Sequence, residues 1–284
     1  MKDIKVIVER IEELPTLPQV ASKVMKLIDD PNSSATDLQR VMSRDAALAG
    51  KMLKLVNSAF YGLPHKVSNL NQAIVLLGFN TIKSLALSVS VFGVFGKAKP
   101  GGKFDRERFW RHSVGSACIY RVLARKVQGV DPETAFVAGL LHDIGKLVLD
   151  QYAPEELAAI LAEAEKRQCA FVDAERALFG ADHSIIGGQL ADRWGFPDVL
   201  ASWIKQHHTA GLEEKDPRIA ISVFSDYLVK VKGIAASGSF DPAILNKAAW
   251  TCLKLEKTDL PPIIVEVNQE IKLADEMLAI GMSK

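Results

Sequence analysis

The sequence predicts an all-α fold with at least ten helices arranged in two packed lobes. Apolar residues recur at helical spacing in most segments of the chain. No segment combines the sustained alternation of a strand with an Asn-Gly or Asp-Gly turn. Residues that typically begin or end helices are frequent, and they bound the expected elements.

In the first part of the chain, residues 19–28 and 45–56 each gather their apolar side chains on one helical face. These side chains are Val20, Val24, Leu27 and Ile28 in the first segment, and Leu48, Met52, Leu55 and Val56 in the second. We therefore expect an amphipathic helix over each segment.

Later helices are marked by their ends. Asp131-Pro132-Glu133 combines an N-cap residue, a proline at the first helical position and an acidic first turn. Ala153-Pro154-Glu155 opens another helix in a similar way. Gly180 and Gly195 are typical of helix C-termini, and Pro197 begins a helix that continues to about His207.

The segment 97–103, with the sequence KAKPGGK, concentrates helix breakers and positive charge. We place the boundary between two lobes there: residues 1–96 form the N-terminal lobe and residues 104–284 the second. A polar break at residues 235–241 separates the last helices from the rest of the second lobe.

Charge and hydropathy exclude several classes of protein. The 35 basic and 34 acidic residues give a net charge of +1, which argues against bulk binding to nucleic acid or an anionic membrane. The basic residues around 97–111 are interpreted as a solvated linker and helix face. The N-terminus has no apolar signal core, and the apolar stretch 85–96 is too short to span a bilayer. We expect a cytoplasmic protein without a membrane partner.

Histidines and aspartates stand out on the apolar background. His142-Asp143 follows an apolar helix in the segment GLLHDIGK, and four of the five other histidines lie in or at an end of an expected helix. The complete candidate set is His112, His142, Asp143, His183, His207, His208 and Asp226. A lone histidine in a loop, such as His65, is in contrast typical of a surface residue.

Imidazole and carboxylate groups together suit divalent transition metals. A charged aspartate on a mainly apolar helix is costly unless it is paired or bound to a metal, which gives Asp143 and Asp226 a physical reason to be ligands. The alternative is that these side chains only form hydrogen bonds. We expect iron or manganese, with zinc or nickel also compatible, because mixed nitrogen and oxygen sites accept several ions.

The order H…HD…H…HH…D resembles that of the HD superfamily of metal-dependent phosphohydrolases. The resemblance implies that His112, His142, Asp143 and Asp226 hold one ion. It implies that Asp143 bridges to a second ion held by His183 and His207, with His208 as a further ligand or a neighbouring contact. Lys146 matches a lysine that faces the phosphate in related enzymes, so Lys146 and Asp143 are the candidate catalytic residues.

Four motifs in the N-terminal lobe narrow the resemblance to HDOD proteins, the HD-related output domains of bacterial signalling. They are LPTLP at 14–18, DAALA at 45–49, NSAFYG at 57–62 and AIVLLG at 73–78. Their residues suit turns and helix ends, although a ligand-binding role for Asn57 or Tyr61 stays open. Many HDOD proteins lack the metal-binding residues that this chain retains. Ala46 replaces a usual proline, which changes only a helix start.

Cyclic di-GMP hydrolysis of the HD-GYP type is disfavoured. In those enzymes an acidic residue and a Gly-Tyr-Pro segment follow the double histidine, whereas here Thr209-Ala210-Gly211-Leu212 follows His208. Arg108 also stands where some trimetal members have an acidic ligand.

Two functions follow from the resemblance. The first is a stand-alone signalling module with a mono- or dinuclear metal site, acting through a signalling protein partner or a small phosphate-containing ligand. The second is a metal-dependent phosphohydrolase, in which two ions clamp a phosphate and Lys146 stabilises negative charge. Nucleic acid is not an expected partner of either.

Overall fold

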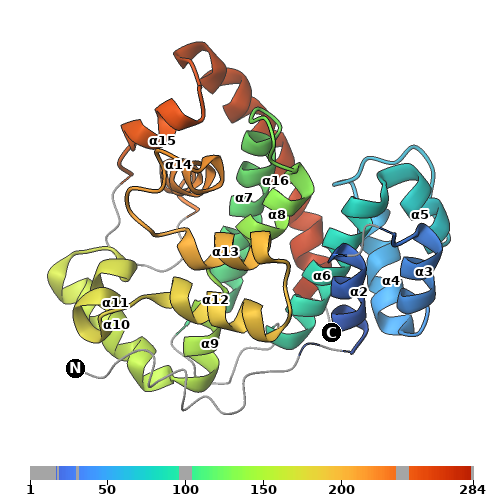
Figure 1. The fold of residues 1–284 in the computed structure, drawn as a ribbon, viewed down its shortest axis with the longest axis horizontal. Helices are drawn as coiled ribbons and strands as arrows, with labels where there is room; N and C mark the ends of the chain where they lie inside the picture. The colour runs from blue at the N-terminus through green and yellow to red at the C-terminus, as the bar shows by residue number, and fades with distance from the viewer. Residues whose placement is uncertain (1–16, 18, 30–31, 96–103, 235–242, 283–284) are drawn as a thin grey trace.

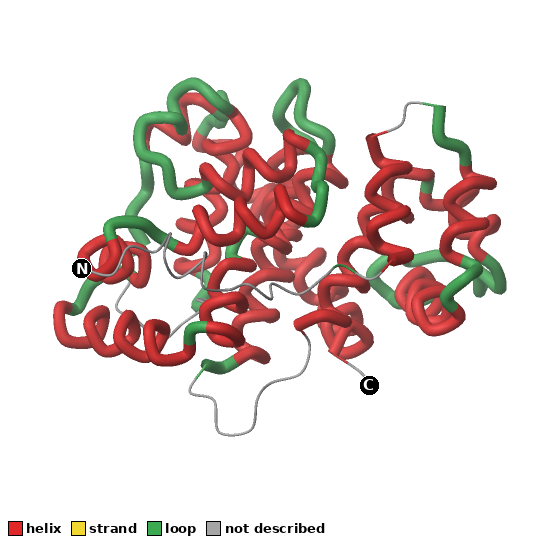
Figure 2. Tube along the Cα trace, turned by 60° about the horizontal axis from the view of Figure 1, so that its bottom comes forward, coloured by secondary structure: helices red, strands yellow, loops and turns green. Residues whose placement is uncertain are grey.

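The computed structural model describes residue 17 and residues 19–29, 32–95, 104–234 and 243–282. Within these residues the chain forms fifteen α-helices and one 3₁₀ helix, with no strand (Figure 2). The expected all-α fold is therefore confirmed. Most of the LPTLP motif, the linker 97–103 and the break 235–241 lie outside the described residues.

The described residues of the N-terminal lobe form five helices, on the right of Figure 1. They are α2 (Gln19–Asp29), α3 (Ala35–Met42), α4 (Ala46–Val56), α5 (Leu70–Leu77) and α6 (Phe79–Phe95). Helix α6 packs against α2, α4 and α5 and also against α8 of the second lobe.

In the second lobe, the other helices are arranged around the pair α7 and α8, which lies at the centre of Figure 1. Its first helices are α7 (Arg106–Ala124), α8 (Pro132–Leu141), α9 (Ile144–Tyr152), α10 (Pro154–Arg167), α11 (Phe171–Phe179) and α12 (His183–Arg193). The remaining elements are α13 (Asp198–Gln206), α14 (Pro217–Val231), α15 (Lys247–Cys252), the 3₁₀ helix η1 (Lys257–Asp259) and α16 (Leu260–Met282). Helix α16 packs on α7 and returns to α4 and α6.

Short polar side chains fix the starts of most helices. Each accepts a hydrogen bond from a backbone N–H of the first turn, which has no partner inside the helix. The residues are Ser34, Asp45, Asn69, Asp105, Asp131, Asp182, Asp216 and Asn246. Ser34 and Asp37 form a complete capping box.

The expected helix ends are also present. Gly180 and Gly195 adopt left-handed conformations with φ of 73° and 67°, which favour glycine. Asn57 ends α4, and its side-chain amide both donates to and accepts from the backbone of Val67 at 2.8 and 2.7 Å. The NSAFYG motif therefore closes a turn in the N-terminal lobe.

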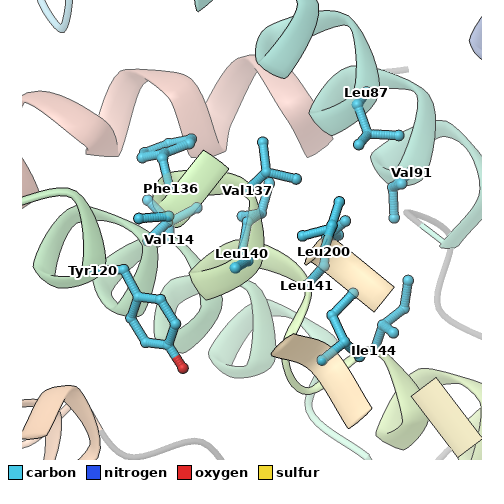
Figure 3. Close-up of a cluster of buried hydrophobic side chains, with 14 of the residues drawn as sticks. Leu87, Val91, Val114, Tyr120, Phe136, Val137, Leu140, Leu141, Ile144 and Leu200 are labelled. Atoms are coloured by element: carbon cyan, nitrogen blue, oxygen red, sulfur yellow. The ribbon is translucent and has the colours of Figure 1, made fainter. Parts of the chain in front are cut away.

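One hydrophobic core runs through both lobes. Figure 3 shows its central part, where Phe136, Val137, Leu140 and Leu141 of α8 meet side chains of α6, α7 and α13. Helices α7 and α8 approach closely at Gly139, which has no side chain. A Cβ at this position would lie 2.8 Å from Cα of Ala117. This tight pair is the scaffold on which the polar site is built.

None of the helices in the described part of the chain combines the length and the apolar character that a membrane crossing requires.

Candidate metal centre

Six of the seven predicted ligands come together, five of them at the ends of four helices and one within α7. His112 projects from α7, whereas His142 and Asp143 occupy the sharp junction between α8 and α9. His183 is the first residue of α12, and His207 and His208 follow the last residue of α13. The Asp143 carboxylate does not cap α9, which leaves it available to the surrounding imidazoles.

Asp143 is the centre of this group, called here the His/Asp cluster. Its carboxylate lies 2.8 Å from Nε2 of His183 and 3.4 Å from Nε2 of His112. Nε2 of His142 and of His207 lie 3.5 and 3.7 Å away. These five side chains are buried, and His208, the sixth member of the cluster, is half-buried.

Hydrogen bonds orient three of these imidazoles through the opposite ring nitrogen. Nδ1 of His112, His142 and His207 lies 3.0, 2.8 and 2.7 Å from the carbonyl oxygens of Ile234, Gly139 and Ile204. A carbonyl oxygen can only accept, so each Nδ1 carries the proton and each neutral ring has a bare Nε2. This is the arrangement that metal-binding histidines use.

The donor set fits a divalent cation. The bare Nε2 atoms of His112 and His142 face one another at 3.4 Å, beside the Asp143 carboxylate. Nε2 of His207 is buried and has no hydrogen-bond partner within the described residues. Lone pairs packed this closely repel one another unless a positive charge lies between them.

The cluster divides into two groups that share Asp143. His112, His142 and Asp143 form one, and Asp143, His183, His207 and His208 form the other. Within each group, one ligand atom from every residue lies within 4.8 Å of the rest. A shared carboxylate can bridge two ions, so the geometry accommodates a mononuclear or a dinuclear centre.

Burial and charge set the protonation of the cluster. Burial holds the pKa values of His142 and His208 well below that of an ordinary histidine. Burial opposes ionisation of Asp143, but His142, Lys146 and His183 keep its pKa well below the usual range. Burial also opposes protonation of His183, but Glu175 and Asp143 outweigh that effect and raise its pKa to about 9.

Asp226, which the sequence resemblance places with His112, His142 and Asp143, does not lie within the group that they form. It lines the cavity beside the cluster but belongs to neither group of close ligand atoms. Its side chain is 47% exposed, and its carboxylate pairs with Nζ of Lys230 at 2.5 Å. The expected cost of an isolated charge on an apolar helix is therefore absent, because water and Lys230 compensate it. Its role as a ligand stays a prediction.

Lys146 also takes an unexpected place. Its ammonium donates to Oδ2 of Asp143 at 2.6 Å and lies 5.1 Å from the ring centroid of Phe171. It is buried and is not among the residues that line the cavity. The described geometry thus directs Lys146 to the central carboxylate rather than to a phosphate position.

Sequence reasoning missed two residues on α11. Glu175, which is 0% exposed, accepts from Nδ1 and the backbone N–H of His183 at 2.6 and 3.0 Å. Arg176 donates to Asp182 at 2.8 Å and to the His208 carbonyl at 2.9 Å. Glu175 falls on the apolar face of α11 with Phe171 and Phe179, and that position was the signal that could have found it.

A cavity of about 250 Å³ adjoins the cluster. Its walls are formed by one face each of α7 and α14, the α8–α9 junction, residues 207–213 and the N-cap residue of α15. The lining residues are His112, Ser116, Tyr120, His142, His207, His208, Thr209, Ala210, Glu213, Ser222, Val223, Ser225, Asp226 and Asn246. A small ligand can therefore reach the imidazoles of both groups.

A sequence profile of the HDOD domain matches residues 14–210. A protein of Treponema pallidum (strain Nichols) is 25% identical over 228 residues, 79% of this chain and 44% of that protein. Bacillus subtilis YuxH is 28% identical over 126 residues, 43% of this chain and 30% of YuxH. The chain thus spans less than half the length of these relatives.

Solved structures share the fold. An HDOD domain protein of unknown function from Geobacter sulfurreducens has a TM-score of 0.81 and 23% identity, covering 97% of this chain and 99% of that chain. A candidate signal transduction protein from Marinobacter aquaeolei VT8 has a TM-score of 0.74 and 22% identity, covering 100% and 62%. A candidate phosphohydrolase from Shewanella amazonensis SB2B has a TM-score of 0.70 and 23% identity, covering 97% and 96%.

Proposed function

Since the chain belongs to the HDOD family, we propose that it is a regulatory protein whose His/Asp cluster holds one or two divalent metal ions. The observation that carries the proposal is the convergence of imidazole Nε2 atoms on the buried Asp143 carboxylate. Iron or manganese suits this mixed set, with zinc or nickel as alternatives. The protein acts through a signalling partner or a small phosphate-containing ligand that enters the adjoining cavity.

Both groups of ligands depend on Asp143, and the test uses this dependence. The full chain is stripped of metal, reloaded with Mn²⁺ or Fe²⁺ and analysed for bound metal after desalting. The wild type retains metal, Asp143→Asn retains almost none, and His183→Ala loses only the ion of its own group. Asp192→Asn, an exposed carboxylate on α12, is the matched control. Equal metal content in Asp143→Asn and the wild type contradicts the proposal.

The cavity favours a second candidate function, metal-dependent hydrolysis of a phosphate ester. When bound, such an ion polarises the ester and activates water for attack. His112 and His142 are buried where they border the cavity, and Lys146 places a positive charge beside Asp143. Because that ammonium pairs with the Asp143 carboxylate, it lowers the negative charge that a phosphate would meet at the cluster.

Hydrolysis is tested with metal-loaded protein on nucleotides, cyclic dinucleotides and a chromogenic phosphoester. If the candidate function is correct, Lys146→Met lowers turnover while the metal content stays nearly intact. If protein with fully occupied metal sites shows no turnover, hydrolysis is rejected and the regulatory function remains. Turnover that survives Asp143→Asn identifies a contaminating enzyme.

A further inference from the structure

The cavity beside the His/Asp cluster has acceptor groups that the metal ligands do not use. Glu213, in the turn after His208, lines the cavity and belongs to neither ligand group. Asn246 donates to its Oε1 at 3.4 Å, and this contact holds the carboxylate in place. Its Oε2 is buried and has no hydrogen-bond partner among the described residues.

Ser225 presents a second polar atom to the same cavity. It lies on α14 and is 1% exposed, and its Oγ has no partner within the described part of the chain. Leaving a buried polar group without a partner costs about 1–3 kcal/mol. Two such atoms in one cavity, one of them on a carboxylate, indicate that a ligand or ordered water completes their hydrogen bonds.

The charge of the lining identifies the missing group. None of the described residues that line the cavity is a lysine or an arginine, whereas Glu213 and Asp226 are both acidic. Asp226 is paired with Lys230, so Glu213 is the carboxylate with an uncompensated oxygen. A phosphate group would bind at the positively charged metal centre, whereas the organic part of the same ligand would face the hydrogen-bond acceptors Glu213 and Ser225. That part must therefore donate hydrogen bonds.

We propose that Glu213 selects small phosphate esters whose organic part carries a hydrogen-bond donor, either an ammonium or a hydroxyl group. Glu213 is then a specificity-determining residue of the cavity, and Ser225 assists it. The inference rests on the proposed binding of phosphate-containing ligands at the metal centre. The volume of about 250 Å³ is below the roughly 300–1,000 Å³ of pockets for drug-sized ligands, so the ester is small.

The test uses three probes with the same two-carbon skeleton, which hydrolysis cannot consume. They are 2-aminoethylphosphonate, 2-hydroxyethylphosphonate and ethylphosphonate, titrated calorimetrically into the full Mn²⁺-loaded chain. The wild type binds the best donor-bearing probe about tenfold or more tighter than ethylphosphonate, the gain of one charge-assisted hydrogen bond. The order of the amino and hydroxyl probes distinguishes the two kinds of donor.

Variants locate the selectivity. Glu213→Gln removes the charge but keeps an acceptor, so it loses any ammonium preference and retains part of a hydroxyl preference. Ser225→Ala lowers selectivity by a smaller factor and provides a second test if Glu213→Gln folds poorly. Glu214→Gln changes the neighbouring exposed carboxylate and leaves the probe order as in the wild type. Metal content is measured for every variant.

The outcomes separate the two proposals. Equal affinity of the wild type for all three probes overturns the role of Glu213 and leaves phosphate binding at the metal intact. Unchanged selectivity in Glu213→Gln has the same consequence. Failure of inorganic phosphate and every probe to bind fully metal-loaded protein overturns the proposed phosphate ligand itself.

Discussion

At the scale of single residues, Glu175 is a buried partner of one proposed ligand, His183. It is fully buried, and it holds His183 by both the ring and the backbone. Its carboxylate makes the imidazole of His183 a stronger electron donor to a metal ion and fixes the direction in which Nε2 points. Carboxylates in this position are worth about 10- to 100-fold in metal affinity in other proteins.

We therefore predict that Glu175→Gln weakens the ion held by His183 by about 10- to 100-fold. The amide oxygen still accepts from Nδ1, but the charge that supports the imidazole is gone. Competition with a coloured chelator measures the affinity. Asp173→Asn, an exposed change on the same helix, keeps the wild-type value, and an equal loss in both variants would contradict the prediction.

The sequence order of histidines and aspartates predicted which side chains gather at the cluster, except for the placement of Asp226. This order says nothing of Glu175 or Arg176, whose contacts with His183 and Asp182 depend on where α11 lies relative to the start of α12. It also could not predict that Lys146 reaches back to Asp143 at 2.6 Å. Motif order specifies residue types, whereas the rotamers of long side chains depend on neighbours that are distant in sequence.

At the scale of helices, the cluster depends on a close crossing of α9 and α12. A Cβ on Gly145 would lie 2.0 Å from the carbonyl oxygen of His183, far closer than a non-bonded carbon and oxygen can approach. Gly187, on the other helix, has its Cβ position 3.4 Å from N of Gly145. The two glycines let the backbones touch, and this contact brings His183 to Asp143.

Gly145→Ala is predicted to destabilise the fold by about 3 kcal/mol, the upper end of typical overpacking costs, and to lower metal content as α12 moves away. Gly93→Ala is the matched control, because a Cβ there meets nothing within 4 Å on exposed α6 surface. It should stabilise by about 0.5–1 kcal/mol. Urea unfolding gives both values, and a neutral Gly145→Ala would show that the helices separate freely.

The helices were predictable where their ends carry local signals. Asp131-Pro132, Ala153-Pro154 and Gly180 each bound a helix as expected, because caps and breakers act on adjacent backbone groups. The glycine contacts between α9 and α12 were not predictable. Gly145 follows the HD motif at a distance of two residues, but nothing local in the sequence shows that another backbone approaches it.

At the scale of the whole molecule, a buried arginine connects the two lobes. Arg121 of α7 pairs with Glu270 of α16 at 2.5 Å and with Glu133 of α8 at 3.8 Å. Its guanidinium also lies 4.5 Å from the ring centroid of Phe60 in the N-terminal lobe and 4.7 Å from that of Phe136. Together with the shared core, this contact argues that the lobes do not fold separately.

We therefore expect residues 97–103 to be a linker within one cooperative unit and not a boundary between two lobes that fold independently. All four tryptophans, at positions 110, 194, 203 and 250, lie in residues 104–284. Trp110 and Trp194 contact Phe92 and Phe95 of α6, so tryptophan fluorescence reports on the second lobe and on its contact with the first. Far-ultraviolet circular dichroism reports on helices of both lobes. The two probes can distinguish one cooperative unfolding transition from two.

We predict that both probes give the same urea midpoint for the wild type. Arg121→Met keeps much of the apolar contact with Phe60 but leaves Glu270 without its closest cation. Loss of one member of a buried ion pair costs about 3–5 kcal/mol, and Arg125, 2.7 Å from Glu270, should keep the cost near the lower value. Both midpoints should fall together, since the arginine contacts both lobes. A fluorescence midpoint that falls while a second helical transition stays at the wild-type value would show that the lobes unfold independently.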